Sequence, residues 1–183
     1  MKKAFTLIEL VFVIVIIGIL AAVIIPRMRT HPVAEAAVDL LAKIRYTQHL
    51  SIVNDKYDTS DATWFQDRWQ ISFATNTYSI QSENNNTYAM STIDSTQEIK
   101  NIELKGLDNL VLSDGCSGQS IISFDYLGRP LVGSLSAITS SYVSTGNGKL
   151  LAFDTNCTIK LTNGTETSFI DIQPETGYAS IRQ

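Results

Sequence analysis

A nearly continuous apolar stretch at the start of the chain is its longest hydrophobic feature. It runs from Phe5 to Ile25, after a short basic leader of residues 1–4. At about 1.5 Å per residue it would form a helix about 31 Å long, close to the thickness of a bilayer's hydrocarbon core. A secretory signal peptide has a shorter apolar region of about 7–15 residues before its cleavage site. The pattern therefore predicts a retained membrane helix over residues 5–25.

Glu9 is the ionisable residue inside this apolar stretch. A carboxylate in a membrane helix costs about 2.5–3.5 kcal/mol near the bilayer centre, and such a group is usually kept for a partner. Cleavage between Ala4 and Phe5 would create a positive amine, and pairing would offset part of the cost of both charges. The alternative is that Glu9 reaches the lipid headgroups or pairs with its own terminus.

Beyond the apolar stretch, the pattern predicts a second helical segment. The apolar residues fall largely on one face of a helix; they are Val33, Ala36, Ala37, Leu40, Leu41, Ile44 and Ile52. We expect this amphipathic half of the stem to cover residues 26–58 and to end near residues 55–59. Gly18 and Pro26 are expected helix breaks, because glycine allows close helix approach and proline removes a hydrogen bond. Pro32 predicts a bend outside the membrane.

From residue 59 to residue 183 the pattern predicts a globular β-rich domain. Trp69, Ile71 and Phe73 alternate with polar residues, and residues 78–80 would complete a hairpin. Further strands are expected at residues 99–104, 110–112, 120–124, 158–161, 168–172 and 178–181, with loops at 83–97 and 133–148. Asn163-Gly164 is a tight-turn signal. A long helix followed by antiparallel strands defines an α+β fold.

The net charge bears on which partners the protein can bind, and the two cysteines bear on the cellular compartment of the large domain. The net charge is −4 and 17% of residues are charged, which argues against nucleic acid as the main partner because phosphate binding needs surplus Lys and Arg. Cys116 and Cys157 lie outside any CxxC motif and have no histidine nearby, so a zinc site is disfavoured. Outside the cytoplasm they would form a disulfide; the alternative is two unpaired buried thiols.

Basic residues flank both ends of the apolar stretch, Lys2 and Lys3 before it and Arg27 and Arg29 after it. The positive-inside rule therefore gives no orientation. A disulfide in the large domain favours an N-in topology with that domain outside the cytoplasm.

The residues Phe5-Thr6-Leu7-Ile8-Glu9-Leu10 are followed by an apolar run, Gly18, residues 19–22 and Pro26. This nearly continuous pattern resembles the N-terminus of type IV pilins and type II secretion pseudopilins. The resemblance implies cleavage between Ala4 and Phe5 by a prepilin peptidase, methylation of the Phe5 amine, and an assembly role for Glu9 opposite the amine of a neighbouring subunit. Ala4 departs from the family, which usually has glycine before the cut.

A second, scattered resemblance lies in the globular domain. It is carried by residues 68–71, 78–80, 123–130 and 170–172 together with Gly177. These segments are similar to H-type minor pseudopilins and fimbrial T-type minor pilins. The resemblance implies the pilin fold and a low-copy subunit of a pilus or of a type II secretion pseudopilus.

The expected function is therefore structural, as a filament subunit and not as an enzyme. Its partners would be other pilins or pseudopilins, the prepilin peptidase and the inner-membrane assembly platform. It would be a single-pass inner-membrane protein with a periplasmic C-terminal domain before it enters a filament. Two alternatives stay open: a major type IV pilin, and a membrane-anchored periplasmic domain that binds DNA during uptake or a secreted cargo.

No cofactor or metal is expected. His31 and His49 lack partners at ligand spacing, and Asp55, Asp58 and Asp61 lack the loop glycine and distal glutamate of a calcium loop. Nucleophile, base and orienting group are not visible together. Asn85 and Asn156 lie in N-x-[ST] triplets, of which Asn85 is the better glycosylation candidate, since Asn156 adjoins a cysteine.

Overall fold

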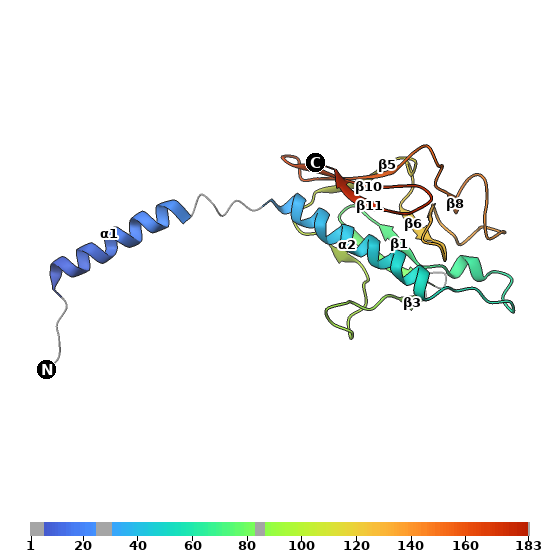
Figure 1. Ribbon diagram of the computed structural model, residues 1–183, viewed down its shortest axis with the longest axis horizontal. Coiled ribbons are helices and arrows are strands. Elements are labelled where there is room, and N and C mark those ends of the chain that lie inside the picture. The colour runs from blue at the N-terminus through green and yellow to red at the C-terminus, as the bar shows by residue number, and fades with distance from the viewer. Residues whose placement is uncertain (1–5, 25–30, 83–86, 183) are drawn as a thin grey trace. The chain divides into compact units, whose positions relative to one another are not determined.

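A computed structural model describes residues 6–24, 31–82 and 87–182 (Figure 1). The chain divides into two compact units, Met1–His31 and Pro32–Gln183. In the first unit the described residues form one helix, α1 (Leu7–Ile24). The expected continuous stem is thus represented by two separate helices, since residues 25–30 lie outside the described part.

The second unit begins with helix α2 (Pro32–Val53). Pro32 occupies the first helical position, where its missing N–H has no intrahelical partner to lose. It therefore starts α2. The bend expected at Pro32 concerns its link to residues outside the described part and stays a prediction. The predicted apolar face is confirmed over most of its length, since five of its members are buried: Val33, Ala36, Ala37, Leu40 and Ile44. The prediction that Ile52 belongs to this face is wrong, because its side chain is half exposed.

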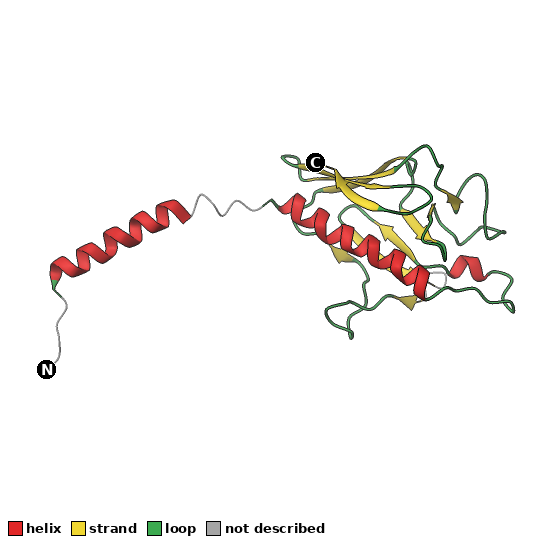
Figure 2. Cartoon of the chain, in the orientation of Figure 1, coloured by secondary structure: helices red, strands yellow, loops and turns green. Residues whose placement is uncertain are grey.

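Two antiparallel sheets follow a short 3-10 helix at Trp64–Asp67 (Figure 2). The first sheet has the order β3-β2-β1-β6-β7-β8, with β4 also paired to β2. Its strands are β1 (Gln70–Phe73), β2 (Thr77–Ser82), β3 (Thr87–Tyr88), β4 (Ile102–Glu103), β6 (Ile121–Phe124), β7 (Pro130–Val132) and β8 (Lys149–Leu150). The second sheet has the order β11-β10-β9-β5. Its strands are β5 (Asn109–Asp114), β9 (Cys157–Thr162), β10 (Thr167–Ile172) and β11 (Ala179–Arg182).

The predicted α+β class and the antiparallel pairing are confirmed. The hairpin pairs Phe73 with Tyr78 and Ile71 with Ile80. Asn163-Gly164 lies in the turn between β9 and β10, which pair over six residues. The sequence missed the short strands β3, β7 and β8, and it overextended the strand expected at 99–104, of which Ile102–Glu103 is assigned to β4. α2 ends at Val53, slightly before the expected end.

One hydrophobic core joins α2 to both sheets. The buried face of α2 packs against β1 and β6 of the first sheet and against β9, β10 and β11 of the second. Among the largest fully buried side chains are Leu40 and Ile44 of α2, Ile71 and Ile122 of the first sheet, and Ile159 and Leu161 of the second. Each buried aliphatic side chain contributes about 1.5–3 kcal/mol relative to exposure. The face of α2 toward the sheets therefore holds the two sheets in one unit.

Cys116 and Cys157 form a disulfide whose Cα atoms are 5.0 Å apart. Both residues are fully buried. Since 41 residues separate them, the bond lowers the entropy of the unfolded chain by an amount worth about 4 kcal/mol. It ties the turn after β5 to the first residue of β9, and it confirms the disulfide interpretation over that of two free thiols.

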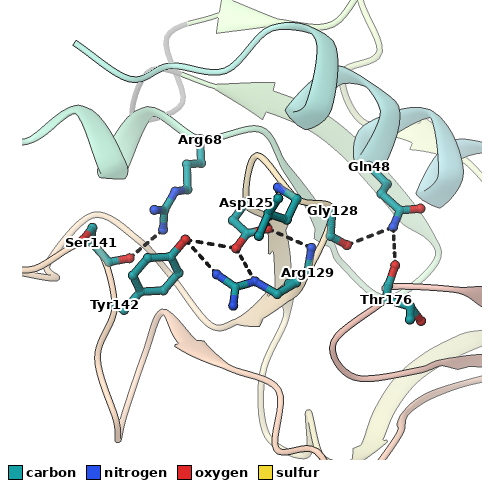
Figure 3. Close-up of polar contacts among 9 residues, drawn as sticks. Gln48, Arg68, Asp125, Gly128, Arg129, Ser141, Tyr142 and Thr176 are labelled. Atoms are coloured by element: carbon teal, nitrogen blue, oxygen red, sulfur yellow. Dashed lines mark hydrogen bonds and ion pairs between the residues drawn. The ribbon is translucent and has the colours of Figure 1, made fainter.

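A polar contact fixes the turn between β6 and β7 against α2. The Gln48 Nε2 donates to the Gly128 carbonyl at 2.9 Å and to the Thr176 carbonyl at 2.8 Å (Figure 3). Gly177 has a φ of 62°, and a Cβ added there would overlap the Gly128 carbonyl oxygen. The α2 helix, the β6–β7 turn and the turn before β11 thus meet closely at a position that excludes a side chain.

We predict that Gly177→Ala destabilises the protein by about 3 kcal/mol, because it combines positive-φ strain of about 1–2 kcal/mol with a backbone overlap. Gly146→Ala is the matched control, since Gly146 has a φ of 78° and no atom lies within 4 Å of its added Cβ. That variant carries the conformational cost alone. Urea unfolding of the full-length chain in detergent measures both, and equal losses would refute the close approach as the cause.

Candidate assembly site

The expected processing and assembly residues are only partly within the described chain. Ala4, Phe5 and Pro26 lie outside the described residues, as does Asn85. Cleavage, methylation and glycosylation therefore stay predictions. Thr6, Glu9 and Gly18 are described, and they show how the apolar helix begins and continues.

Thr6 begins α1. Its carbonyl accepts hydrogen bonds from the Glu9 N–H at 3.1 Å and from the Leu10 N–H at 3.3 Å. The Glu9 N–H also approaches the Thr6 hydroxyl oxygen at 3.4 Å. The order Thr-x-x-Glu is that of a capping box, in which the first residue satisfies a free N–H of the opening turn. Sequence reasoning overlooked this local role, although the spacing from Thr6 to Glu9 signals it.

Glu9 itself lies in the first turn of α1 and is exposed within its own unit. A carboxylate near a helix N-terminus interacts favourably with the helix dipole, by about 0.3–1 kcal/mol. Capping and dipole effects are therefore local reasons for an acid at this position. They make the neutral isostere glutamine the informative substitution, because glutamine retains the capping-box geometry and removes the charge.

The side chains of α1 are apolar all round the helix and none of those described is buried. Large aliphatic and aromatic residues from Leu7 to Leu20 are exposed by 43–82%. A helix that is hydrophobic on every side is normally covered by a protein core or by lipid. Among the described residues of its own unit, nothing covers the apolar surface of α1.

Gly18 lies inside α1, which continues without a break to Ile24. A Cβ added at Gly18 would find no atom within 4 Å. No contact described within the chain requires glycine here. The expected melting or kinking near Gly18 concerns the assembled fibre and stays a prediction.

In the part of the chain that the structure describes, no helix combines the length and the apolar character needed to cross a membrane.

A second polar cluster lies in the globular unit, at the turn between β6 and β7. Asp125 is fully buried. Its Oδ1 accepts from the backbone N–H of Leu127 at 3.0 Å and of Arg129 at 2.8 Å. Its Oδ2 accepts from the Arg129 Nε at 2.7 Å and from the Tyr142 hydroxyl at 3.0 Å (Figure 3). One carboxylate therefore satisfies four donors and fixes the turn.

Two guanidinium groups flank the ring of Tyr142. Arg129 lies 5.2 Å and Arg68 4.9 Å from the ring centroid, and Arg68 also lies 5.0 Å from the Trp64 ring. The Arg68 Nη1 donates to the Ser141 carbonyl at 2.7 Å. Such contacts attract a cation to the ring face. They attach the segment of residues 133–148 to the first sheet.

The electrostatic environment of the cluster follows from burial and from Asp125. Burial lowers the pKa of Arg68. Burial would also lower the pKa of Arg129, but the hydrogen bond and the charge of Asp125 outweigh it and raise that pKa. Burial, together with the negative charge of Asp125, raises the pKa of Tyr142. Guanidinium groups are not deprotonated in proteins, so the cluster joins one buried carboxylate to Arg129 and Tyr142 and acts as a structural clamp.

The remaining candidate groups have ordinary surroundings. Asp58 and Asp61 each accept from the backbone N–H two residues on, as in Asx turns. The hydrogen bonds with Ser60 lower the pKa of Asp58. His49 is exposed. Among the described residues no three His, Cys, Asp or Glu side chains are grouped closely enough to hold a metal ion.

Residues 1–25 match the family described as the prokaryotic N-terminal methylation motif. This motif is the signal of type IV pilin-like proteins that are processed by a prepilin peptidase. It implies assembly with other pilins and a location in a membrane or a pilus. No curated protein and no solved structure gave a match to the chain. The match covers the segment that contains Ala4, Phe5, Glu9 and Gly18 and leaves the globular unit unassigned.

We predict that Asp125→Asn lowers the free energy of unfolding by about 2–3 kcal/mol. In one orientation the new amide NH₂ faces the N–H groups of Leu127 and Arg129, and in the other it faces the Arg129 Nε. An unpaired buried donor is costly in both. Asp94→Asn is the control, because exposed Asp94 accepts from the Thr96 N–H and hydroxyl and an asparagine oxygen can replace it. That variant should change stability by less than about 0.5 kcal/mol. Chemical denaturation compares the two, and a neutral Asp125→Asn would refute the clamp.

Proposed function

We propose that this chain is a pilin-like structural subunit, specifically a minor pilin or pseudopilin of a type IV pilus or of a type II secretion pseudopilus. The observation that carries the proposal is the N-terminal methylation motif on residues 1–25, joined to a helix whose apolar side chains are exposed on all sides. Processing of such a segment prepares a stem that packs with the stems of other subunits.

The physical basis of assembly would be the burial of α1 together with one charge pair. Before assembly, lipid would cover the apolar stretch of residues 5–25 with the C-terminal domain in the periplasm. In a filament, the stems of neighbouring subunits would replace lipid. The methylated amine of Phe5 would keep its positive charge, and Glu9 of a neighbouring subunit would neutralise it. Each charge is unfavourable alone in an apolar layer, so the pair favours one axial register.

The minor-subunit assignment rests on the globular unit. Residues 123–130 resemble the corresponding segment of H-type minor pseudopilins and T-type minor pilins. They form the end of β6, the following turn and the start of β7. Asp125 fixes the turn from inside, and Gln48 of α2 holds Gly128 from outside. Gly177, part of the same resemblance, lies against Gly128. Two of the scattered segments of the resemblance therefore lie together in the structure, which supports the proposal.

We predict that the mature chain begins at Phe5 and carries one methyl group on its amine. Intact-mass analysis and N-terminal sequencing of the protein purified from membranes measure both features. A host strain without prepilin peptidase is the control, in which residues 1–4 should remain. An unprocessed N-terminus in the normal host would reject the proposed class and favour a membrane-anchored binding domain.

We further predict that Glu9→Gln reduces incorporation into filaments about tenfold or more, because it leaves the amine of Phe5 unpaired in an apolar layer. Thr6→Ala is the matched control: it removes the hydroxyl cap at a cost of about 1 kcal/mol but keeps the charge, so incorporation should persist. The fraction of subunit in sheared filaments relative to membranes, determined by immunoblotting, gives the result. Normal incorporation of Glu9→Gln would leave Glu9 with a capping role only.

A further inference from the structure

Strand β5 has one edge that is not paired with another strand in the described part of the globular unit. β5 ends the four-stranded sheet and pairs over six residues with β9. Its other edge pairs with no strand among the described residues. Backbone N–H and C=O groups along such an edge are a template for another extended chain.

The other edges of the two sheets are short or covered. β3 and β4 have two residues each. β8 is bridged by Val143 through Lys149. β11 packs against α2, and the Arg45 guanidinium donates to its Ala179 carbonyl at 2.8 Å. β5 contains no lysine, arginine or proline, the residues that commonly protect an edge from pairing.

A small apolar groove runs beside this edge. It has a volume of about 200 Å³ and is lined by Phe73, Leu110, Val111 and Leu112 and by residues 118–120. Small-molecule sites usually exceed about 300 Å³, so the groove fits a side chain better than a ligand. Leu110 and Leu112 face the core, whereas Val111 is 46% exposed on the opposite face. Strand addition combines backbone pairing with pockets for alternate side chains in this way.

Negative charges at the two ends of β5 favour a partner strand with positively charged ends. Asp108 precedes the strand and Asp114 ends it, and both are exposed. In an antiparallel pairing of two copies with Val111 opposite Val111, Asp108 of each copy would face Asp114 of the other. Like charges directly opposite destabilise a sheet. Self-pairing is therefore disfavoured, and a strand with cationic ends is favoured.

We propose that the free edge of β5 binds an extended segment of another protein by strand addition. The segment has alternating apolar residues and carries Lys or Arg at both ends, about 20 Å apart, matching the six-residue separation of Asp108 and Asp114 at about 3.3 Å per residue. This proposal is independent of the processed stem, since it concerns residues of the globular unit alone.

The test uses the full-length protein in detergent micelles and a fluorescent peptide of sequence Lys-Thr-Val-Thr-Val-Thr-Lys with blocked ends. With its Lys residues opposite Asp108 and Asp114, its two Val side chains lie on the face of Leu110 and Leu112. Fluorescence anisotropy measures affinity, and hydrogen exchange followed by mass spectrometry locates the contact. We expect saturable binding with slower exchange at residues 109–114. A peptide with Glu at both ends should bind at least tenfold more weakly.

Val111→Lys adds a charge to the open edge and should weaken peptide binding at least tenfold. Thr167→Lys is the matched control, because Thr167 is exposed in β10, a strand paired on both sides; its affinity should stay within about twofold. The double variant Asp108→Asn, Asp114→Asn should lose about five- to tenfold, as two exposed ion pairs allow.

Three results would overturn the proposal. The first is absence of saturable binding, or binding that Val111→Lys leaves unchanged. The second is equal affinity for the Glu-ended peptide, which contradicts a cationic partner. The third is a dimer of the peptide-free protein, seen by light scattering, that Val111→Lys dissociates; this result assigns the edge to a second copy.

Discussion

The globular unit depends on one helix face that serves two sheets. Val33, Leu40 and Ile44 of α2 are buried against strands from both sheets, so neither sheet has an apolar face that closes without the helix. Antiparallel sheets commonly leave one face to water. Here the inner faces converge on α2, and polar contacts such as that of Gln48 with Gly128 specify where the turns sit relative to it. The opposite face of α2 remains open.

The two units fit different requirements of the proposed function: a domain that is stable by itself and a helix that is free to associate. The globular unit is stabilised by its own contacts: Asp125 accepts four hydrogen bonds, and a disulfide joins the turn after β5 to β9. Helix α1 does the opposite and exposes apolar side chains throughout. A chain with a stably folded domain and a helix of exposed apolar side chains is suited to assembly, because association can bury the helix without rearranging the domain.

The sequence predicted the features that follow from local periodicity. The spacing of Val33, Ala36 and Leu40 is sufficient for the buried face of α2, and alternation at Ile71 and Phe73 is sufficient for β1. Short strands such as β7 and β8 escaped prediction because two or three residues carry no measurable period; their pairing depends on tertiary contacts. The division into two sheets could not be derived either, since register alone does not say where one sheet ends.

The clamp around Asp125 was visible in sequence only as a resemblance. Its four donors come from Leu127, Arg129 and the distant Tyr142, and no periodicity links positions 125 and 142. The reverse holds for Glu9. Its sequence motif is specific, whereas the contact of its N–H with the Thr6 hydroxyl, three residues earlier, is evident from the structure.

The position of Thr6 directly before α1 has a consequence for maturation. Thr6 follows the proposed cut, so the same hydroxyl and carbonyl can open the helix in the precursor and in the shortened chain. Peptidase action would then alter the charge at the tip and leave the secondary structure as it was. The first turn of the stem would then be the same in the bilayer before and after processing, and the new positive charge would be the change that prepares the subunit for assembly.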